Sequence, residues 1–182
     1  YAANAFLATK LSFINAIAAI CEGVGADIND VVVGMGSDKR IGENFLRPGP
    51  GWGGSCFPKD SRALIKIAED ADYSFDLLKG VITVNDQQFE RVVQKVVQAA
   101  NGDPTETTIA VWGLTFKAGT DDLRDSPSIE IIRRLLAIGF KVQAFDPTVE
   151  KSKQGIPENL NLSLSPIEVT VGADVLLILT EW

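Results

Sequence analysis

The segment Thr108-Ile109-Ala110-Val111-Trp112-Gly113-Leu114 decides the fold, because it is a compact run of apolar and β-branched residues typical of a buried strand. A polar loop follows, and then Ser126-Pro127 opens an amphipathic helix, since proline suits the first helical position. Gly139 ends that helix, and residues 141–145 and 174–179 predict two further strands with a short helix between them. This alternation is the pattern of a parallel α/β sheet.

The hundred residues before this segment predict helices instead. Apolar side chains recur at three- and four-residue steps over about residues 2–24, and we expect Gly23 and Gly25 to end that helix, because glycine accepts the left-handed conformation. Three further helices are expected: through 31–35 after a cap at Asp27 or Asn29, over 61–71 after a cap at Asp60, and over 77–100. We therefore expect a helical domain over 1–100 and an α/β domain over 101–182.

The charge balance excludes two general classes of partner. The 182 residues include 17 Lys and Arg against 24 Asp and Glu, which gives a formal net charge of −7. Nucleic acid and anionic membranes both favour basic surfaces, so we expect neither as a partner. The sequence also lacks an uninterrupted apolar run of the roughly 18 residues typical of a membrane span.

The absence of histidine narrows the possible chemistry. It removes Ser-His-Asp and Cys-His catalysis and every His-based metal site. Two cysteines, Cys21 and Cys56, are too few for a disulfide framework or a four-cysteine zinc site, so we expect no metal. Cys21 lies on an apolar helix face and is expected to be an inert, buried thiol.

The glycine-rich stretch Phe45-Leu46-Arg47-Pro48-Gly49-Pro50-Gly51-Trp52-Gly53-Gly54-Ser55-Cys56-Phe57-Pro58-Lys59-Asp60 is the strongest candidate site. Three of its glycines match the spacing GxGxxG, but a dinucleotide fingerprint requires a preceding strand, and a helix is expected here. One interpretation is a plain glycine-rich linker. The other is covalent catalysis, in which Lys59 favours the reactive thiolate of Cys56 and Asp60 orients or deprotonates water.

A second candidate site is the segment 113–127, at the carboxyl end of one predicted strand and the start of a helix, where ligands of open α/β sheets collect. Lys117 and Arg124 are natural partners for phosphate. Alternatively, both cations pair with the neighbouring aspartates on a solvated loop, and the sequence alone does not separate these interpretations.

The Cys56 loop, the segment Phe116-Lys117-x-x-Thr120-Asp121-Asp122-x-Arg124-Asp125-Ser126-Pro127 and Asn4-Ala5-Phe6 resemble, in order and spacing, the UDP-glucose/GDP-mannose dehydrogenase family. The resemblance implies an all-helical central dimerisation domain over 1–100, followed by a partial Rossmann-like parallel α/β nucleotide-sugar domain over 101–182. It also implies that the chain is an internal fragment, inactive alone, of a cytoplasmic NAD-dependent enzyme whose NAD-binding domain precedes Tyr1.

The resemblance implies an activity and a role for each matching residue. UDP-glucose would be oxidised to UDP-glucuronate, with Cys56 carrying first a thiohemiacetal and then a thioester. Asn4 would hydrogen-bond the developing oxyanion, and Asp60 would act with water in proton transfer. Cys56, Lys59 and Arg124 would contact NAD.

The resemblance assigns the nucleotide sugar to two parts of the chain, with one residue supplied by the neighbouring subunit of a homodimer. The implied substrate-binding residues are Asn4, Arg40 (from the neighbouring subunit), Phe45, Leu46, Arg47, Gly49, Gly51, Trp52, Gly53, Phe116 and Lys117. Lys10 is expected to be only an exposed helix charge. Two alternatives remain open: a family member that oxidises GDP-mannose, and a non-catalytic module for dimerisation and nucleotide binding.

Overall fold

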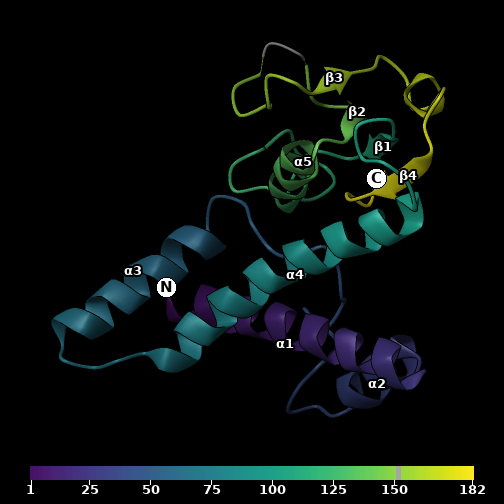
Figure 1. The fold of residues 1–182 in the computed structure, drawn as a ribbon. Helices are drawn as coiled ribbons and strands as arrows, with labels where there is room; N and C mark the ends of the chain where they lie inside the picture. Colours follow the sequence, from purple (N-terminus) through teal and green to yellow (C-terminus); the bar gives the residue numbers. More distant parts are fainter. Residues whose placement is uncertain (151–152) are drawn as a thin grey trace. The chain divides into compact units, whose positions relative to one another are not determined.

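Helices occupy most of the first hundred residues of the computed structural model, which describes residues 1–150 and 153–182 (Figure 1). They are α1 (Ala2–Val24), α2 (Ile28–Gly36), α3 (Phe57–Asp70) and α4 (Asp76–Ala100). Two features expected from the sequence are confirmed: Gly25 ends α1 in the left-handed conformation, with φ of 73°, and the Asp27 side chain caps α2 by accepting from the Asn29 N–H at 2.8 Å.

The predicted start of α3 is wrong by four residues. The helix begins at Phe57 with Cys56 as its N-cap, and Asp60 lies in the first turn instead of capping the helix. Pro58 does not prevent this, because the first N–H groups of a helix have no intrahelical partner to lose.

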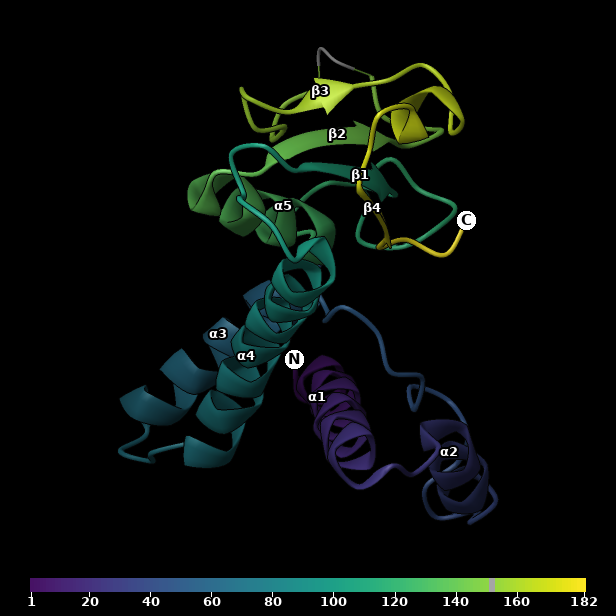
Figure 2. The ribbon, with the colours of Figure 1, turned by 45° about the vertical axis from the view of Figure 1, so that its right-hand side comes forward.

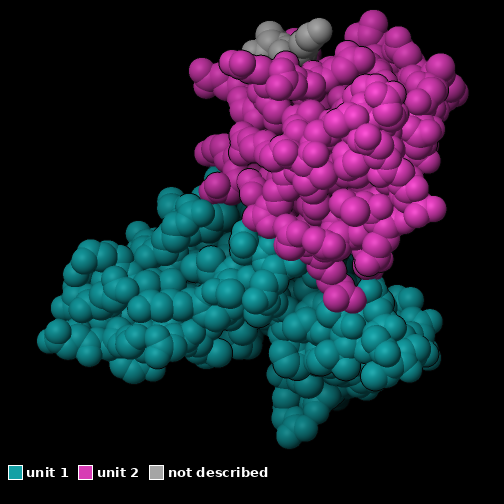
Figure 3. All heavy atoms as spheres, viewed as in Figure 1, with its two compact units in different colours: residues 1–88 teal, residues 89–182 magenta. Residues whose placement is uncertain are grey.

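The chain forms two compact units, residues 1–88 and residues 89–182, which are coloured separately in Figure 3. The division falls inside α4, whereas the sequence places a domain boundary at residue 101. In the first unit, α1, α3 and the beginning of α4 pack around a small apolar core. Its buried members are Ala5, Ala8, Trp52, Leu78 and Val81.

The second unit is the predicted parallel α/β fold, which is confirmed. Its elements are β1 (Thr108–Trp112), α5 (Pro127–Ile138), β2 (Lys141–Phe145), β3 (Asn161–Leu162), the 3-10 turn η1 (Glu168–Thr170) and β4 (Val175–Ile178). All the strand pairs are parallel and the order is β3-β2-β1-β4, with Ile109 opposite both Val142 and Val175 (Figure 2).

The core of this unit lies between the sheet, α5 and the second half of α4. Buried side chains from the sheet and from the two helices pack together there. They include Ile109 and Val111 of β1, Ile131, Ile132 and Leu135 of α5, and Val93 of α4. Strand β3 was not expected, because two residues are too few to show an alternating pattern. Strand β1 ends two residues before Leu114 because Gly113 turns the chain with φ of 91°.

Helix α1 is long and apolar enough to cross a membrane by length and composition, with a mean hydropathy of 1.4 over its 18-residue window. One third of that window is buried inside the structure, and core helices of soluble proteins pass the same test. The length and composition of α1 are therefore only weak evidence for a membrane span. The expectation that the protein has no membrane partner stays a prediction.

Candidate functional site

Cys56 lies at the amino-terminal end of α3, where its side chain is exposed. Its carbonyl oxygen accepts the hydrogen bond from the Asp60 N–H at 2.8 Å, which starts the helix. The Ser55 hydroxyl is 3.6 Å from the Cys56 sulfur. A helix N-terminus favours negative charge, so this position suits a sulfur that reacts as a thiolate and is open to a ligand.

A hydrogen-bonded pair of polar side chains, half-buried Asn4 and buried Asp60, joins the start of α1 to the first turn of α3. The Asn4 amide donates to Asp60 Oδ2 at 2.6 Å, and Lys59 Nζ lies 3.5 Å from Oδ1. The bond from Asn4 is the main reason why the pKa of the Asp60 carboxyl lies below its ordinary value; burial opposes the shift and Lys59 adds to it. Asp60 is therefore a carboxylate at neutral pH.

Two buried oxygens at this site have polar capacity left. Ser61 Oγ lacks a hydrogen-bond partner among the described residues, and Asp60 Oδ1 has only the long contact with Lys59 Nζ. An amide nitrogen carries two N–H groups, so the bond to Asp60 leaves Asn4 a second donor. The structure thus brings the predicted catalytic residues Asn4, Cys56 and Asp60 to the same end of α3, with polar atoms left over for a bound molecule.

The glycine loop (residues 45–56) is held by side chains that the sequence analysis missed. Asn85 of α4 accepts from the Trp52 N–H at 2.8 Å and donates to the Trp52 carbonyl at 3.0 Å. Asn15 accepts from the Gly49 N–H at 2.9 Å, and Gln88 donates to the Gly49 carbonyl at 2.8 Å. The signal in the sequence that could have indicated these residues is a polar amide side chain on an otherwise apolar helix face.

The predicted substrate-binding residues of this loop differ in what they could offer a ligand. Leu46 and Trp52 are buried, so in this structure neither offers an exposed surface to a ligand. Phe45 is exposed and adopts φ of 62°, which is unusual for a residue with a side chain. Arg47 is exposed, whereas Gly53 is buried.

Two cations of the first unit behave differently from each other. Arg40 is exposed and forms a two-pronged ion pair with Asp38, with one contact at 2.6 Å, and this bond lowers the pKa of the Asp38 carboxyl. Lys10 is half-buried and donates to the Ile41 carbonyl at 3.0 Å and the Gly42 carbonyl at 3.5 Å. The expectation that Lys10 is a plain exposed charge is therefore wrong, because it ties a turn to α1.

In the second unit, a buried carboxylate holds the loop that follows β1. Asp146, at the end of β2, accepts from the Leu114 N–H at 2.8 Å, the Thr115 N–H at 3.3 Å and the Trp182 indole at 3.2 Å. Burial alone would raise the pKa of the Asp146 carboxyl, but the bonds from Leu114, Thr148 and Thr115 outweigh it and lower the pKa.

This arrangement decides what the β1–α5 loop can bind. In a dinucleotide-binding fold, main-chain N–H groups after the first strand face the phosphates. Here Asp146 already accepts from two of these N–H groups, so they are not open to a phosphate. Phe116 is half-buried and Lys117 is exposed, with Lys117 Nζ 5.4 Å from the centre of the Phe116 ring.

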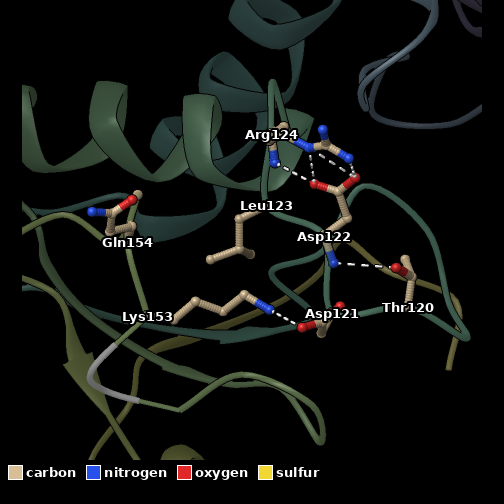
Figure 4. A pocket seen from close by; sticks show the side chains of 8 residues that line it. Thr120, Asp121, Asp122, Leu123, Arg124, Lys153 and Gln154 are labelled. Atoms are coloured by element: carbon tan, nitrogen blue, oxygen red, sulfur yellow. Dashed lines mark hydrogen bonds and ion pairs between the residues drawn. The ribbon is translucent and has the colours of Figure 1, made fainter.

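Arg124 lines an open pocket of about 670 Å³ in the second unit (Figure 4). Its guanidinium pairs with Asp122 at 2.7 Å, which lowers the pKa of that carboxyl, and Lys153 pairs with Asp121 across the same pocket. The interpretation that Arg124 is paired with a neighbouring aspartate is correct, whereas Lys117 contacts an aromatic ring instead. An anion that entered the pocket would compete with the two aspartates.

The residues predicted to contact NAD are divided between the two units, with Cys56 and Lys59 in the first and Arg124 in the second. Lys59 and Arg124 are exposed cations, and each has a carboxylate beside it. Among residues 1–150 and 153–182 we find no strand followed by a glycine-rich turn whose N–H groups are open to a phosphate. After β1, the N–H groups in the corresponding place donate to Asp146. The described residues also contain no group of three or more side chains suited to a metal ion.

Two family profiles match this chain. The profile described as the UDP-glucose/GDP-mannose dehydrogenase family, central domain, matches residues 1–87, and that of the family's UDP binding domain matches residues 110–182. UDP-glucose 6-dehydrogenase YwqF of Bacillus subtilis is 50% identical over 183 residues, which cover all of this chain and 41% of YwqF.

Solved structures resemble the whole chain as well. A UDP-glucose dehydrogenase from the hyperthermophilic archaeon Pyrobaculum islandicum matches with a TM-score of 0.92 and 34% identity, over 100% of this chain and 42% of that one. A GDP-mannose dehydrogenase from Pseudomonas aeruginosa matches with a TM-score of 0.66 and 30% identity, over 100% of this chain and 44% of that one. The chain therefore spans about two fifths of the length of these relatives.

Proposed function

Because the chain belongs to the UDP-glucose/GDP-mannose dehydrogenase family, we propose that it is part of an NAD-dependent UDP-glucose 6-dehydrogenase. The enzyme would oxidise the C6 alcohol of UDP-glucose twice, to the carboxylate of UDP-glucuronate, in the cytoplasm. The observation that carries the proposal is the exposed sulfur of Cys56 at the N-terminus of α3, the same end of the helix that holds the hydrogen-bonded Asn4–Asp60 pair.

The chemistry follows from what these groups can do. The Cys56 sulfur adds to the C6 aldehyde left by the first oxidation, and this bond keeps the aldehyde in place for the second. The thiohemiacetal loses a hydride and a proton and becomes a thioester. Water then cleaves the C–S bond, which releases the carboxylate and returns the thiol.

The other two residues act on charge and protons. The second N–H of Asn4 donates a hydrogen bond to the sugar oxygen as that oxygen gains negative charge. A neutral amide can stabilise the charge in this way without transferring its proton. Asp60 is ionised at neutral pH, so its carboxylate would orient the attacking water and accept a proton from it.

NAD supplies the acceptor for the two hydrides. The family resemblance assigns Cys56, Lys59 and Arg124 of this chain as its contacts, and the two cations are exposed. For the nucleotide sugar, the family resemblance assigns the glycine loop in the first unit and, separately, Phe116 and Lys117 in the second.

The second copy of a homodimer would pack against the outer face of α1. Phe6, Phe13 and Ile20 recur every seven residues and are 65%, 51% and 59% exposed, so they form an apolar stripe roughly 21 Å long. A stripe at seven-residue spacing packs well against its own copy. Arg40 of the second copy would then be available to the substrate.

A family member that oxidises GDP-mannose is the second candidate, supported by the match to the GDP-mannose dehydrogenase structure over the whole of this chain. Kinetic assays of an enzyme of the relatives' full length, with UDP-glucose and GDP-mannose as competing substrates, would separate the two. Preference for GDP-mannose would overturn the assignment of the substrate and leave the chemistry of Cys56 intact.

Substitution of the sulfur tests the chemistry itself. In the same full-length enzyme, Cys56→Ser is expected to abolish UDP-glucuronate formation, and mass spectrometry of quenched wild-type turnover is expected to show the sugar attached to Cys56. The matched control Cys21→Ala changes the buried thiol and should leave the rate nearly unchanged. Unaltered oxidation by Cys56→Ser would refute covalent catalysis by this sulfur and would leave this part of the enzyme with a role in dimerisation and nucleotide binding only.

A further inference from the structure

We infer that Asn85 and Gln88 of α4, together with Asn15 of α1, are positioning residues for the reaction, because they hold the main chain of Gly49 and Trp52. The inference rests on the proposed function for its effect on catalysis. The contacts that carry it all lie within the first unit.

Asn85 binds Trp52 at both of its main-chain groups. It accepts from the N–H at 2.8 Å and donates to the carbonyl at 3.0 Å, and only 6% of Asn85 is exposed. This is the pairing that a neighbouring strand would provide, but here a side chain provides it. A primary amide has an acceptor and a donor side by side, whereas an ionised carboxylate only accepts and cannot reproduce both bonds.

Gly49 is held in the same way by two helices at once. Its N–H donates to Asn15 of α1 at 2.9 Å, and its carbonyl accepts from Gln88 of α4 at 2.8 Å. Gln88 lies three positions after Asn85, so both amides are on one face of α4. The loop is thus attached at Gly49 and again at Trp52, on either side of Pro50 and Gly51.

The attachment at Trp52 extends to Cys56 through packed rings. The Trp52 indole donates to Ser12 Oγ at 2.9 Å, and its ring meets that of Phe57 edge-on, with centroids 6.3 Å apart. Phe57 follows Cys56 directly and opens α3. A shift of the Trp52 main chain would therefore move the ring that supports the reactive cysteine.

These amides meet a need that apolar packing does not. A glycine-rich segment loses more conformational entropy on ordering than any other, and this one has no helix or strand of its own. Apolar contacts would bury its side chains but leave the direction of its N–H and carbonyl groups unset. Hydrogen bonds from rigid helices set those directions at Gly49 and Trp52, and they thereby fix the position of Pro50 and Gly51 between them.

The test compares neighbouring glutamines on α4. Gln88→Ala removes one bond to Gly49, whereas the control Gln87→Ala removes the same side chain from an exposed position one residue away. In an enzyme of the relatives' full length, we expect Gln88→Ala to raise KM for UDP-glucose about fivefold, the value of one net hydrogen bond, with kcat changed less than about twofold. Gln87→Ala should match the wild type.

Asn85 is tested with an isosteric change. Asn85→Asp keeps an acceptor for the Trp52 N–H but turns an oxygen toward the Trp52 carbonyl, so it should lower kcat about tenfold, the effect of one lost bond and one repulsion. Amide hydrogen exchange should quicken at Gly49 in Gln88→Ala, and alkylation of Cys56 by iodoacetamide should change in rate in Asn85→Asp. A purely structural role would lower the melting temperature and leave these site-specific readouts unchanged.

The outcomes separate this inference from the proposed function. If both variants keep wild-type kcat, KM, exchange and alkylation rates, the positioning role is wrong. If Asn85→Asp does not fold, Gln88→Ala decides by the same readouts. If the wild-type enzyme does not oxidise UDP-glucose, the proposed function is wrong, while exchange at Gly49 and alkylation of Cys56 still decide whether the amides position the loop.

Discussion

Replacement of Gly113 by alanine should strongly destabilise the second unit. Gly113 turns the chain out of β1 with φ of 91°, a conformation that residues with a Cβ rarely adopt. A Cβ at this position would lie 2.3 Å from Thr180 Cβ and 2.6 Å from the Thr180 main-chain nitrogen. These distances are far below van der Waals contact, so the backbone on one side must move.

The size of the effect follows from what has to move. The left-handed conformation costs alanine roughly 1–2 kcal/mol. Thr180 is 4% exposed and donates to the Thr115 carbonyl at 2.8 Å, and the adjacent Leu179 N–H donates to the Trp112 carbonyl at 2.9 Å. Loss of both bonds adds about 1 kcal/mol each, so we expect a loss of about 3–4 kcal/mol in the free energy of unfolding.

Urea denaturation followed by circular dichroism measures this loss. The control is Gly119→Ala, because Gly119 also has a positive φ, of 75°, but no atom lies within 4 Å of the place that the alanine methyl group would take. The control should cost only the conformational part, roughly 1–2 kcal/mol. Equal losses in the two variants would refute the contact with Thr180 as the cause.

Three other predictions concern charge and assembly. Because the pKa of Asp146 is lowered in the folded state, its ionised carboxylate stabilises the fold above the unfolded value of about 4, and this effect disappears as pH falls through the folded pKa. The difference in unfolding free energy between wild type and Asp146→Asn should therefore become smaller below about pH 4. A difference that stays constant with pH would contradict this. Asn4→Ala should raise the pKa of Asp60 toward its ordinary value in an NMR titration, and an unchanged titration would show that Asn4 is not the cause. Phe13→Glu should shift a dimer to monomer in light scattering, whereas Ile67→Glu, at an equally exposed apolar site on α3, should not; a dimer that persists in Phe13→Glu would exclude the α1 face.

The parts of the site that the sequence could predict are those marked by patterns within a few neighbouring residues. The glycine content and the neighbours of Cys56 marked residues 45–60 as a loop that could bind a ligand, and an aspartate after the predicted strand 141–145 was a readable signal for Asp146. The hydrogen bond between Asn4 and Asp60 joins residues 56 positions apart, so no local pattern predicts it. Family resemblance paired these two residues in one site, and the structure supplied the contact.

The sequence by itself determined the class of every element except the two-residue strand β3, because helix and strand periodicities and the conformational freedom of glycine act within a few residues. The alternation after residue 101 is enough to specify a parallel sheet, and Gly25 and Gly139 end their helices where expected. Tertiary structure alone decided which polar groups meet: Asn85 with Trp52 across 33 positions, and Asp146 with Leu114 across 32. Those meetings depend on how whole helices and strands pack, which is a property of the folded chain and not of any segment.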